Sequence, residues 1–405
     1  MFLLLENYNI ICFGPSDWWG MNPSCTTHIM KRFAEKNRVL YINPVSSDLL
    51  GSISRKKRKN IRSRIVRKLK SMSKYIRRPK TNLYVISPLF LPIQGVPLID
   101  WLNNILLRLQ LILILRILKM KHPLIWAENI RSVDMIDKIK NRGIVYHVSD
   151  MFSKCGYTLN KKALEKRENI LTKKADVVIC VSKALYKVKK NEHRNVSYLP
   201  HGVDFELFRQ AVNNHEQLPE LKNIEPPIAG YYGTLTNGND IELLEYCAKN
   251  LPEVSFVFVG QVTTGDYSNL FSFSNVHYLG KLPYEKIPAL CAAFTVCMLP
   301  WRVWDWIKNC NPLKFFEYMS SGRPIVSVEI DEVKSYYSTL TSIAYSSEEF
   351  LNAIVWEIEN DTFERSQKRV NIAREHSWEK HINIISEIIR NAISNKSVHF
   401  DNINS

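Results

Sequence analysis

Short apolar segments rich in Val, Ile, Tyr and Phe alternate with helix-like segments along most of the chain, and this alternation limits the possible folds most strongly. In the first half the apolar segments lie at 9–14, 38–43, 82–87, 123–128, 143–150, 175–182 and 195–200. Apolar strands separated by helices are typical of parallel sheets with helices on both faces. The first half therefore predicts a doubly wound α/β domain.

The alternation is interrupted by a polar segment that ends in two prolines, at 208–227. It restarts with apolar segments at 228–233, 254–260, 276–280, 294–300 and 324–328. A chain of 405 residues suits two domains of ordinary size. We expect Rossmann-like domains at 1–208 and 225–365, a helix at 366–395 that packs across both, and a frayed tail at 396–405.

The charge is distributed unevenly along the chain. The net charge is +16, but residues 1–210 carry +24 and residues 211–405 carry −8. Most of the excess lies at 55–80, where 14 of 26 residues are basic and none is acidic. Such a run can be a solvated insertion, an anionic-membrane contact or an RNA contact. Its only aromatic residue is Tyr75, so it lacks the interleaved aromatics of RNA-binding modules, and a membrane is favoured.

The segment 98–118 is almost entirely apolar but contains Asp100, Arg108 and Arg116. A membrane-spanning helix needs about 20 residues with few or no charges. A buried or interfacial helix fits these residues better. A basic run followed by such a helix is typical of an anchor on an anionic membrane surface.

The beginning of the chain lacks a basic n-region and contains Glu6, so it predicts a first strand and not a secretory signal. The eight cysteines form no CxxC pair, and several lie in apolar segments. These features indicate reduced, packed thiols and a cytoplasmic protein.

Two segments of the second half carry candidate binding residues. Small residues at 233–239 let backbone N–H groups approach a phosphate, although an ordinary turn has the same composition. The segment 312–326 predicts a helix with Lys314 and Glu317 one turn apart on one face. Lys314 can neutralise a diphosphate while Glu317 accepts ribose hydroxyls, and a surface ion pair explains the spacing equally well.

In the first half, Asp150 ends the apolar segment 143–150 and is expected to project at the carboxyl edge of the sheet. It is our candidate general base, with a helix N-cap as the alternative role. His147 is the competing candidate, but strand alternation directs it to the opposite face.

The first loop supplies four more candidates for the acceptor side, Gly14, Asp17, Trp18 and His28. Together with Trp19, the loop can stack on a sugar ring or plug the domain core. The chain contains no D-x-D motif, which removes an obvious carboxylate pair for a metal ion, so we expect neither a metal nor a cofactor.

The segment PLKFFEYMSSGRPIV at 312–326 resembles the signature helix of GT-B glycosyltransferases, and is similar to the family-four and teichuronic-acid-type enzymes. Four segments earlier in the chain occur in the order usual for that family, namely TKKADVVICVSKALYK, NVSYLPHGVDFELF, IAGYYGTL and VSFVFVG. The resemblance covers about 140–330, with looser similarity at 10–45. It implies two Rossmann-like domains facing across a cleft, the first for the acceptor and the second for the donor.

Carried over residue by residue, the resemblance implies that Gly233 and Thr234 contact donor phosphates. It also implies that Lys314, next to Leu313, pairs with the diphosphate and that Glu317 holds the ribose. Residues 279–282, including Gly280, would flank the base. Family-four retaining enzymes usually carry Glu at the position of Asn309, so the stereochemical outcome is not carried over.

The resemblance therefore implies a metal-independent hexosyltransferase of polysaccharide biosynthesis. It would use a nucleoside diphosphate sugar and a glycan or lipid-linked acceptor. The basic run 55–80 and the apolar segment 98–118 predict that it is a peripheral protein on the cytoplasmic face of an anionic membrane. The alternatives are a nucleotide-sugar epimerase of the same fold and a basic nucleic-acid-binding protein. The sequence identifies neither the sugar, the base and the acceptor nor the oligomeric state.

Overall fold

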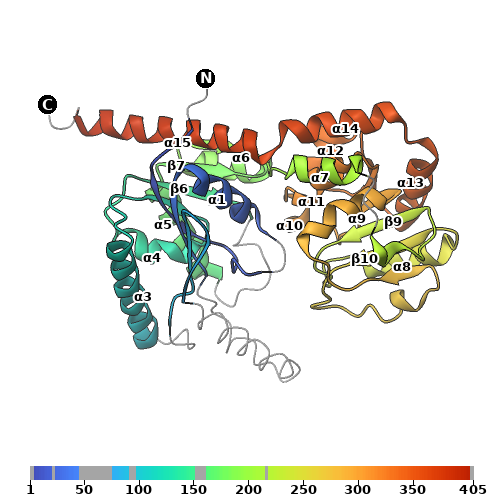
Figure 1. Cartoon of the computed structure of the whole chain (residues 1–405), viewed down its shortest axis with the longest axis horizontal. Helices are drawn as coiled ribbons and strands as arrows, with labels where there is room; N and C mark the ends of the chain where they lie inside the picture. The colour runs from blue at the N-terminus through green and yellow to red at the C-terminus, as the bar shows by residue number, and fades with distance from the viewer. Residues whose placement is uncertain are drawn as a thin grey trace. The chain divides into compact units, whose positions relative to one another are not determined.

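The computed structural model describes residues 4–20, 23–44, 75–90, 97–150, 161–214 and 218–401. The chain forms two compact units (Figure 1). Unit 1 contains Met1–Cys180, Leu185–Tyr198 and Ile382–Ser405, and unit 2 contains Val181–Ala184 and Leu199–His381. Most of the basic run, residues 55–74, lies outside the described residues.

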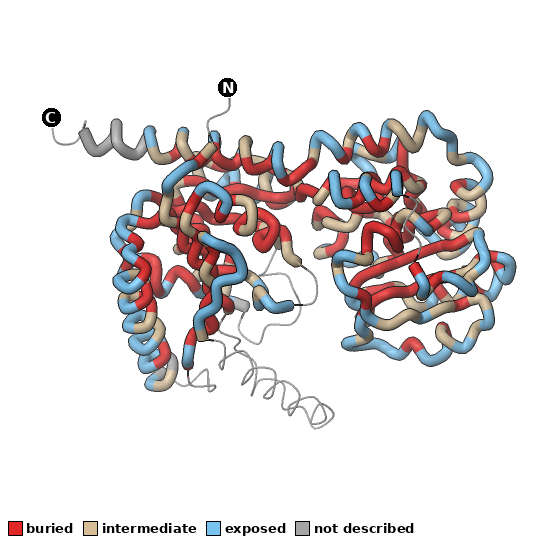
Figure 2. The backbone as a smooth tube through the Cα atoms, in the orientation of Figure 1, coloured by how far each residue is buried: buried red, intermediate tan, exposed pale blue. Residues whose placement is uncertain are grey.

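Unit 1 is built on an eight-stranded sheet of order β3-β4-β2-β1-β5-β6-β7-β8. Its strands are β1 (Asn9–Phe13), β2 (Arg38–Ile42), β3 (Ile76–Lys80), β4 (Leu83–Ile86), β5 (Leu124–Ala127), β6 (Gly143–Val148), β7 (Val177–Cys180) and β8 (Val196–Tyr198). All neighbours are parallel except β3, which pairs antiparallel with β4. The central strands are buried along their length, as apolar strands between two helical layers must be (Figure 2).

The helices of unit 1 are α1 (Cys25–Lys36), α3 (Pro97–Ile117), η2 (Ile130–Ser132), α4 (Val133–Ile136), α5 (Lys161–Lys174), α6 (Lys183–Glu192) and most of α15 (Trp378–Asp401). Helix α1 begins after Ser24, whose hydroxyl accepts a hydrogen bond from the Thr27 N–H. Within the described ranges, none of the helices is both long and apolar enough to cross a membrane.

Unit 2 contains a six-stranded, fully parallel sheet of order β11-β10-β9-β12-β13-β14. Its strands are β9 (Ile228–Tyr232), β10 (Ser255–Val259), β11 (Val276–Tyr278), β12 (Val296–Leu299), β13 (Ile325–Val328) and β14 (Ser342–Ala344). Its helices are α7 (Phe205–Asn213), η3 (Pro219–Leu221), α8 (Ile241–Asn250), η4 (Leu270–Ser272), η5 (Tyr284–Lys286), α9 (Ile287–Ala293), α10 (Asp305–Lys308), α11 (Leu313–Ser321), α12 (Asp331–Tyr337), α13 (Ser347–Asn360) and α14 (Phe363–Glu375).

The two parallel α/β units confirm the predicted fold class, and the structure differs from the sequence pattern in several details. Strands β3 and β14 were not predicted, because β3 is an exposed edge strand of charged residues and proline and β14 has only three residues. Helix α7 and the segment 208–227 belong to unit 2, so the division falls near Leu199.

The last amphipathic stretch forms two helices, α14 and α15. The chain between them pairs with Val203, whose N–H donates to the His376 carbonyl (2.9 Å) and whose carbonyl accepts from the Trp378 N–H (3.0 Å). These bonds take backbone groups that a continuous helix would use, so the helix is interrupted there. Helix α15 continues to Asp401, into the region expected to be a frayed tail.

Candidate functional site

Three glycines shape one edge of the sheet in unit 2. Gly233 and Gly260 follow strands β9 and β10 directly, Gly280 lies just beyond β11, and their φ angles are 141°, 147° and 65°. A Cβ on Gly260 would lie 1.8 Å from the Gly233 carbonyl oxygen, so only glycine allows the two backbones to approach so closely. The space where a Cβ of Gly280 would point is open to 4 Å. Gly233 and Gly260 are themselves buried, so of the three glycines only the half-buried Gly280 borders open space.

Lys314 lies in the first turn of α11 and reaches the same edge. Its ammonium nitrogen lies 5.8 Å from the ring centroids of both Tyr231 and Tyr232, and 5.5 Å from the Trp301 ring. A Cβ on Gly233 would lie 2.4 Å from Lys314 Cε, which shows how closely the side chain passes over this glycine. Three aromatic rings thus hold a cation at the end of β9, by cation–π attraction.

Glu317 lies one turn further along α11 and only 3% of it is exposed. The Tyr232 hydroxyl donates to its Oε2, and the Tyr284 hydroxyl, 3.1 Å away, donates to its Oε1. The Tyr284 hydroxyl also lies 3.4 Å from Asp204 Oδ2. Burial raises the pKa of Glu317 well above its ordinary value, and the neighbouring Asp204 carboxylate raises it further.

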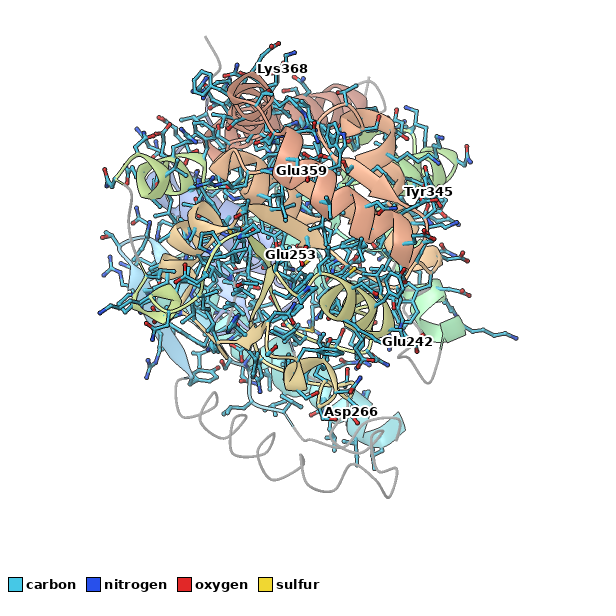
Figure 3. The ribbon with its side chains drawn as sticks, turned by 90° about the vertical axis from the view of Figure 1, so that its right-hand side faces the viewer. Glu242, Glu253, Asp266, Tyr345, Glu359 and Lys368 are labelled. Carbon is cyan, nitrogen blue, oxygen red and sulfur yellow. The ribbon has the colours of Figure 1, made fainter. Side chains whose placement is uncertain are left out.

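Some acidic side chains of unit 2 lie at its surface, whereas Glu332 and Glu357 are buried like Glu317. Figure 3 labels Glu242, Glu253, Asp266 and Glu359 at the surface of this unit, and all four are exposed. A carboxyl group that is buried instead and bonded to two tyrosine hydroxyls is costly unless it has a structural or binding role.

The loop 233–240 is held rigidly between β9 and α8. The Leu235 N–H donates to the Gln261 carbonyl (3.0 Å), while Thr234 is exposed. Asp240 caps α8 by accepting from the Leu243 N–H (3.2 Å). Its carboxylate already occupies the helix start where the sequence pattern predicted a phosphate. Helix α11 has Pro312 as its N-cap residue and no side-chain cap hydrogen bond, so its N-terminus is better suited to an anion.

Two further sequence candidates lie next to α11. Leu313 is the first helical residue and is half-buried. Asn309, which stands where related retaining enzymes usually have Glu, ends α10, and its side-chain amide donates to the Asp305 carbonyl (2.5 Å). In this arrangement Asn309 has a local, helix-ending contact.

In unit 1 the candidates gather at the carboxyl ends of β1 and β6. Asp150 lies two residues beyond β6 and is half-buried, and its charge contributes to raising the pKa of Cys25, although burial is the largest cause. Asp17 is exposed and accepts from the Trp19 N–H (3.0 Å). The Trp18 N–H donates to Asn43 Oδ1 (2.8 Å), which fixes the loop after β1.

Gly14 and His28 are both buried in this loop region. A Cβ on Gly14 would lie 2.0 Å from Tyr41 Cζ, so the absence of a side chain makes room for the Tyr41 ring. Trp18 packs edge-on against the same ring, with centroids 4.9 Å apart. His28 is buried within α1, and only 2% of it is exposed.

The sequence reasoning missed a buried polar cluster below this edge. Glu128 follows β5 directly and accepts from the Thr26 hydroxyl, and its Oε2 lies 3.1 Å from His147 Nδ1. His147 Nε2 lies 3.9 Å from Cys25 Sγ. Burial, and next the Glu128 charge, raise the pKa of Cys25 well above its ordinary value, so this thiol is not an activated nucleophile. An acid directly after a buried strand, the same signal that identified Asp150, would have identified Glu128.

Other residues around Lys314 and Glu317 were also missed. Tyr231, Tyr232 and Trp301 surround Lys314, and Tyr284 contacts Glu317. Within the described ranges no three His, Cys, Asp or Glu side chains are grouped so that they could hold a metal ion.

Comparison with known proteins identifies the class of unit 2. Residues 226–360 match the family described as "Glycosyl transferases group 1". Over 204 residues the chain is 24% identical to TuaH of Bacillus subtilis (strain 168), provisionally named a teichuronic acid biosynthesis glycosyltransferase. That match covers 46% of this chain and 50% of TuaH, so the chain spans about half the length of this curated relative.

Solved structures share the whole fold. Anabaena HepE in complex with UDP is 15% identical, with a TM-score of 0.64 over 95% of this chain and 100% of HepE. The sucrose-phosphate synthase of Thermosynechococcus elongatus is 14% identical, with a TM-score of 0.69 over 96% of this chain and 100% of that chain. The trehalose 6-phosphate synthase of Burkholderia multivorans is 11% identical, with a TM-score of 0.65 over 97% and 100%.

The chain therefore has the GT-B fold. Residues 226–360 form a domain of the glycosyl transferases group 1 type, and the sequence is similar to TuaH.

Proposed function

We propose that this protein is a glycosyltransferase that transfers a sugar from a nucleoside diphosphate sugar to a glycan or lipid-linked acceptor in polysaccharide biosynthesis. The observation that carries the proposal is the grouping of Gly233, Lys314 and the uncapped start of α11 at one edge of unit 2. That edge lies within the segment that matches the glycosyl transferases group 1 family.

In this proposal the donor diphosphate lies against Gly233 and Thr234, with Lys314 and the N-terminus of α11 opposing its charge. As the bond between the sugar and the diphosphate breaks, negative charge develops on the leaving oxygen, and a fixed cation stabilises that charge. The aromatic rings around Lys314 hold its ammonium group in place before the donor binds. These groups supply the positive charge that a metal ion provides in other transferases, so the proposed reaction needs none.

Glu317 is proposed to hold the ribose. Each carboxylate oxygen has a second acceptor position beside the one that a tyrosine hydroxyl occupies. Because Glu317 is almost fully buried, the ribose can reach it only when neighbouring side chains move aside, and Tyr284, which is bonded to Glu317 and only partly buried, is the proposed one. The base is then placed along 279–282, where Gly280 borders open space.

Asp150 is proposed as the general base in unit 1. It would accept the proton of the attacking acceptor hydroxyl while the hydroxyl oxygen bonds to the anomeric carbon and the nucleoside diphosphate departs. The loop and helix beside it contain the other acceptor-side candidates, Gly14, Asp17, Trp18 and His28. Of these, Asp17 and Trp18 have side chains that a sugar can reach.

The acceptor class and the location are proposed from TuaH and from the surface of unit 1. TuaH is named for teichuronic acid biosynthesis, and the apolar helix α3 suits a protein that works on the cytoplasmic face of an anionic membrane. A lipid-linked acceptor remains at the bilayer, so a peripheral enzyme would meet it there.

The test is a transfer assay with a panel of radiolabelled nucleoside diphosphate sugars, beginning with UDP-sugars because HepE was solved with UDP and with UDP-glucose. The full chain is incubated with each donor, with and without membranes that contain glycolipid acceptors. The proposal expects label in the lipid or polysaccharide fraction and release of nucleoside diphosphate that depends on acceptor. Conversion of the donor to another nucleotide sugar without acceptor would show an epimerase instead, and no conversion of any nucleoside diphosphate sugar would contradict the proposal.

A further inference from the structure

Helix α3 lies on the outside of unit 1, and much of it is exposed (Figures 1 and 2). Its exposed apolar side chains form a stripe along the helix. The stripe consists of side chains that are 37–65% exposed, namely Leu98, Trp101, Leu102, Ile105, Leu106, Leu109, Leu113 and Ile117. Asn103, a polar residue of the same helix, is turned inward and is only 6% exposed. A helix at a water-facing surface has the opposite arrangement, with polar residues outward. Among the described residues none covers this stripe.

A groove of about 430 Å³ lies beside the second half of α3, between this helix and the α4 region. Apolar side chains line most of it, including Leu111, Leu115, Met135 and Ile139. Its volume is within the range of about 300–1,000 Å³ that is usual for small-molecule sites. The groove is thus large enough for part of an apolar chain.

Cations surround the groove, and no acidic side chain lines it. The six basic side chains that line it are Arg108, Arg116, Lys119, Lys121, Lys138 and Lys140. None of them forms an ion pair within the described part of the chain. The acids of the α4 region, Asp134 and Asp137, pair instead with Arg167 (3.3 Å) and with Lys174 of α5. The groove is therefore left with uncompensated positive charge.

The turn that carries two of these cations is strained. Lys119 and His122 have φ angles of 51° and 43°, in the left-handed region that favours glycine. A residue other than glycine in this region costs on the order of 1 kcal/mol and is kept where the surroundings hold it. Here the turn places Lys119 and Lys121 at the end of the apolar stripe.

We propose that this surface, the α3 stripe together with the cationic groove, binds the headgroup layer of an anionic bilayer. In the proposed complex α3 lies in the interface, and one anionic phospholipid places an acyl chain in the groove and its phosphate among the cations. An apolar stripe with cations at one end matches a lipid surface, which offers acyl chains and phosphates together. The inference deepens the proposed membrane location, but it concerns unit 1 alone and does not depend on the donor chemistry of unit 2.

The test is co-sedimentation of the full chain with phosphatidylcholine vesicles, with and without phosphatidylglycerol. Two double variants are compared. The groove pair combines Lys138→Ala with Lys140→Ala, and the α6 pair combines Lys187→Ala with Lys190→Ala, which removes the same charge from exposed positions of α6. The groove pair should weaken partition onto anionic vesicles by about 30-fold, because each lysine at an anionic surface contributes roughly fivefold. The α6 pair should have a much smaller effect.

The stripe is tested with Leu109→Asn and Leu113→Asn, two exposed positions where the substitution leaves the core unchanged. This variant should lose vesicle binding even at low salt. Trp101 supplies a spectroscopic readout, since insertion should shift its emission to the blue, and Trp101→Phe should remove that shift.

Several results would overturn the inference. These are equal binding to neutral and anionic vesicles, equal losses for the groove and α6 pairs, or a concentration-dependent dimer that buries Trp101 without lipid. Nucleotide binding is measured on the same preparations. A variant that loses vesicle binding and keeps nucleotide binding is altered only at the membrane surface of unit 1. A protein that binds vesicles but no nucleotide would speak against the proposed transferase activity and not against this surface.

Discussion

Replacing Lys314 by methionine removes the ammonium group at the proposed donor site and keeps an apolar stem of similar length. The parent ammonium lies 5.5–5.8 Å from three aromatic rings, those of Tyr231, Tyr232 and Trp301. The rings can pack against the methionine stem, so we expect the thermal midpoint to change little. A hydrogen bond to a charged group contributes about 1.5–3 kcal/mol. Its loss should therefore weaken binding of a nucleoside diphosphate by about 10- to 150-fold, at 1.4 kcal/mol per factor of ten.

Isothermal titration with UDP at low and moderate salt measures this effect. Lys249→Met is the matched control, because Lys249 is exposed in the last turn of α8, at the opposite edge of the unit 2 sheet. Lys314→Arg should retain most of the affinity, since it keeps the charge. If Lys314→Met bound UDP as tightly as the parent and Lys249→Met, the assignment of Lys314 to the diphosphate would be wrong.

Three further predictions concern the other acidic and basic groups. Asp150→Asn should preserve donor affinity and lower turnover by about 10²-fold or more, as expected for loss of a general base, and near-parental turnover in the transfer assay would exclude this role. Glu317 has a raised pKa, so its ionisation destabilises the folded state as pH rises above about 4.5. Urea unfolding of Glu317→Gln should accordingly show a smaller loss of stability from pH 5 to pH 8 than the parent, and identical pH profiles would contradict this. Burial lowers the pKa of His376 to about 4 and of His381 to about 3, so unfolding free energy should fall as the pH decreases from about 6.5 toward 4. His381→Gln should reduce that dependence, and an unchanged slope would show that other groups cause it.

The sequence pattern predicted the two parallel sheets well, because buried strands need apolar residues on both faces. It also placed Gly233 at the end of β9 and Lys314 and Glu317 on one helix, since these positions follow from local spacing alone. It did not find Tyr284 of η5, whose hydroxyl donates to Glu317, or Asp204 just before α7, which lies within 3.4 Å of that hydroxyl. Periodicity describes one element at a time and does not show which side chains another element supplies.

The same limit applies to α3. Its composition indicated a buried or interfacial helix, but the direction of its apolar side chains depends on which residues pack against α4 and the sheet. The structure turns Asn103 inward and leaves leucines outside, an orientation that no hydropathy pattern encodes. Glu128 carried the same sequence signal as Asp150, but its partners Thr26 and His147 come from α1 and β6, so the polar cluster around it could not be read from its own strand.

The central claim is that unit 2 binds a nucleoside diphosphate sugar through the edge formed by Gly233 and Lys314. The most direct measurement is the thermal midpoint of the full chain against a panel of nucleoside diphosphates and their sugars, with Lys314→Met in parallel. A ligand at 100 times its Kd adds about 2.7 kcal/mol to the stability of the folded state. The account predicts that one nucleoside diphosphate raises the midpoint of the parent and not of Lys314→Met at the same concentration. If no nucleotide raised the midpoint, or if the variant responded like the parent, the account of this site would be contradicted.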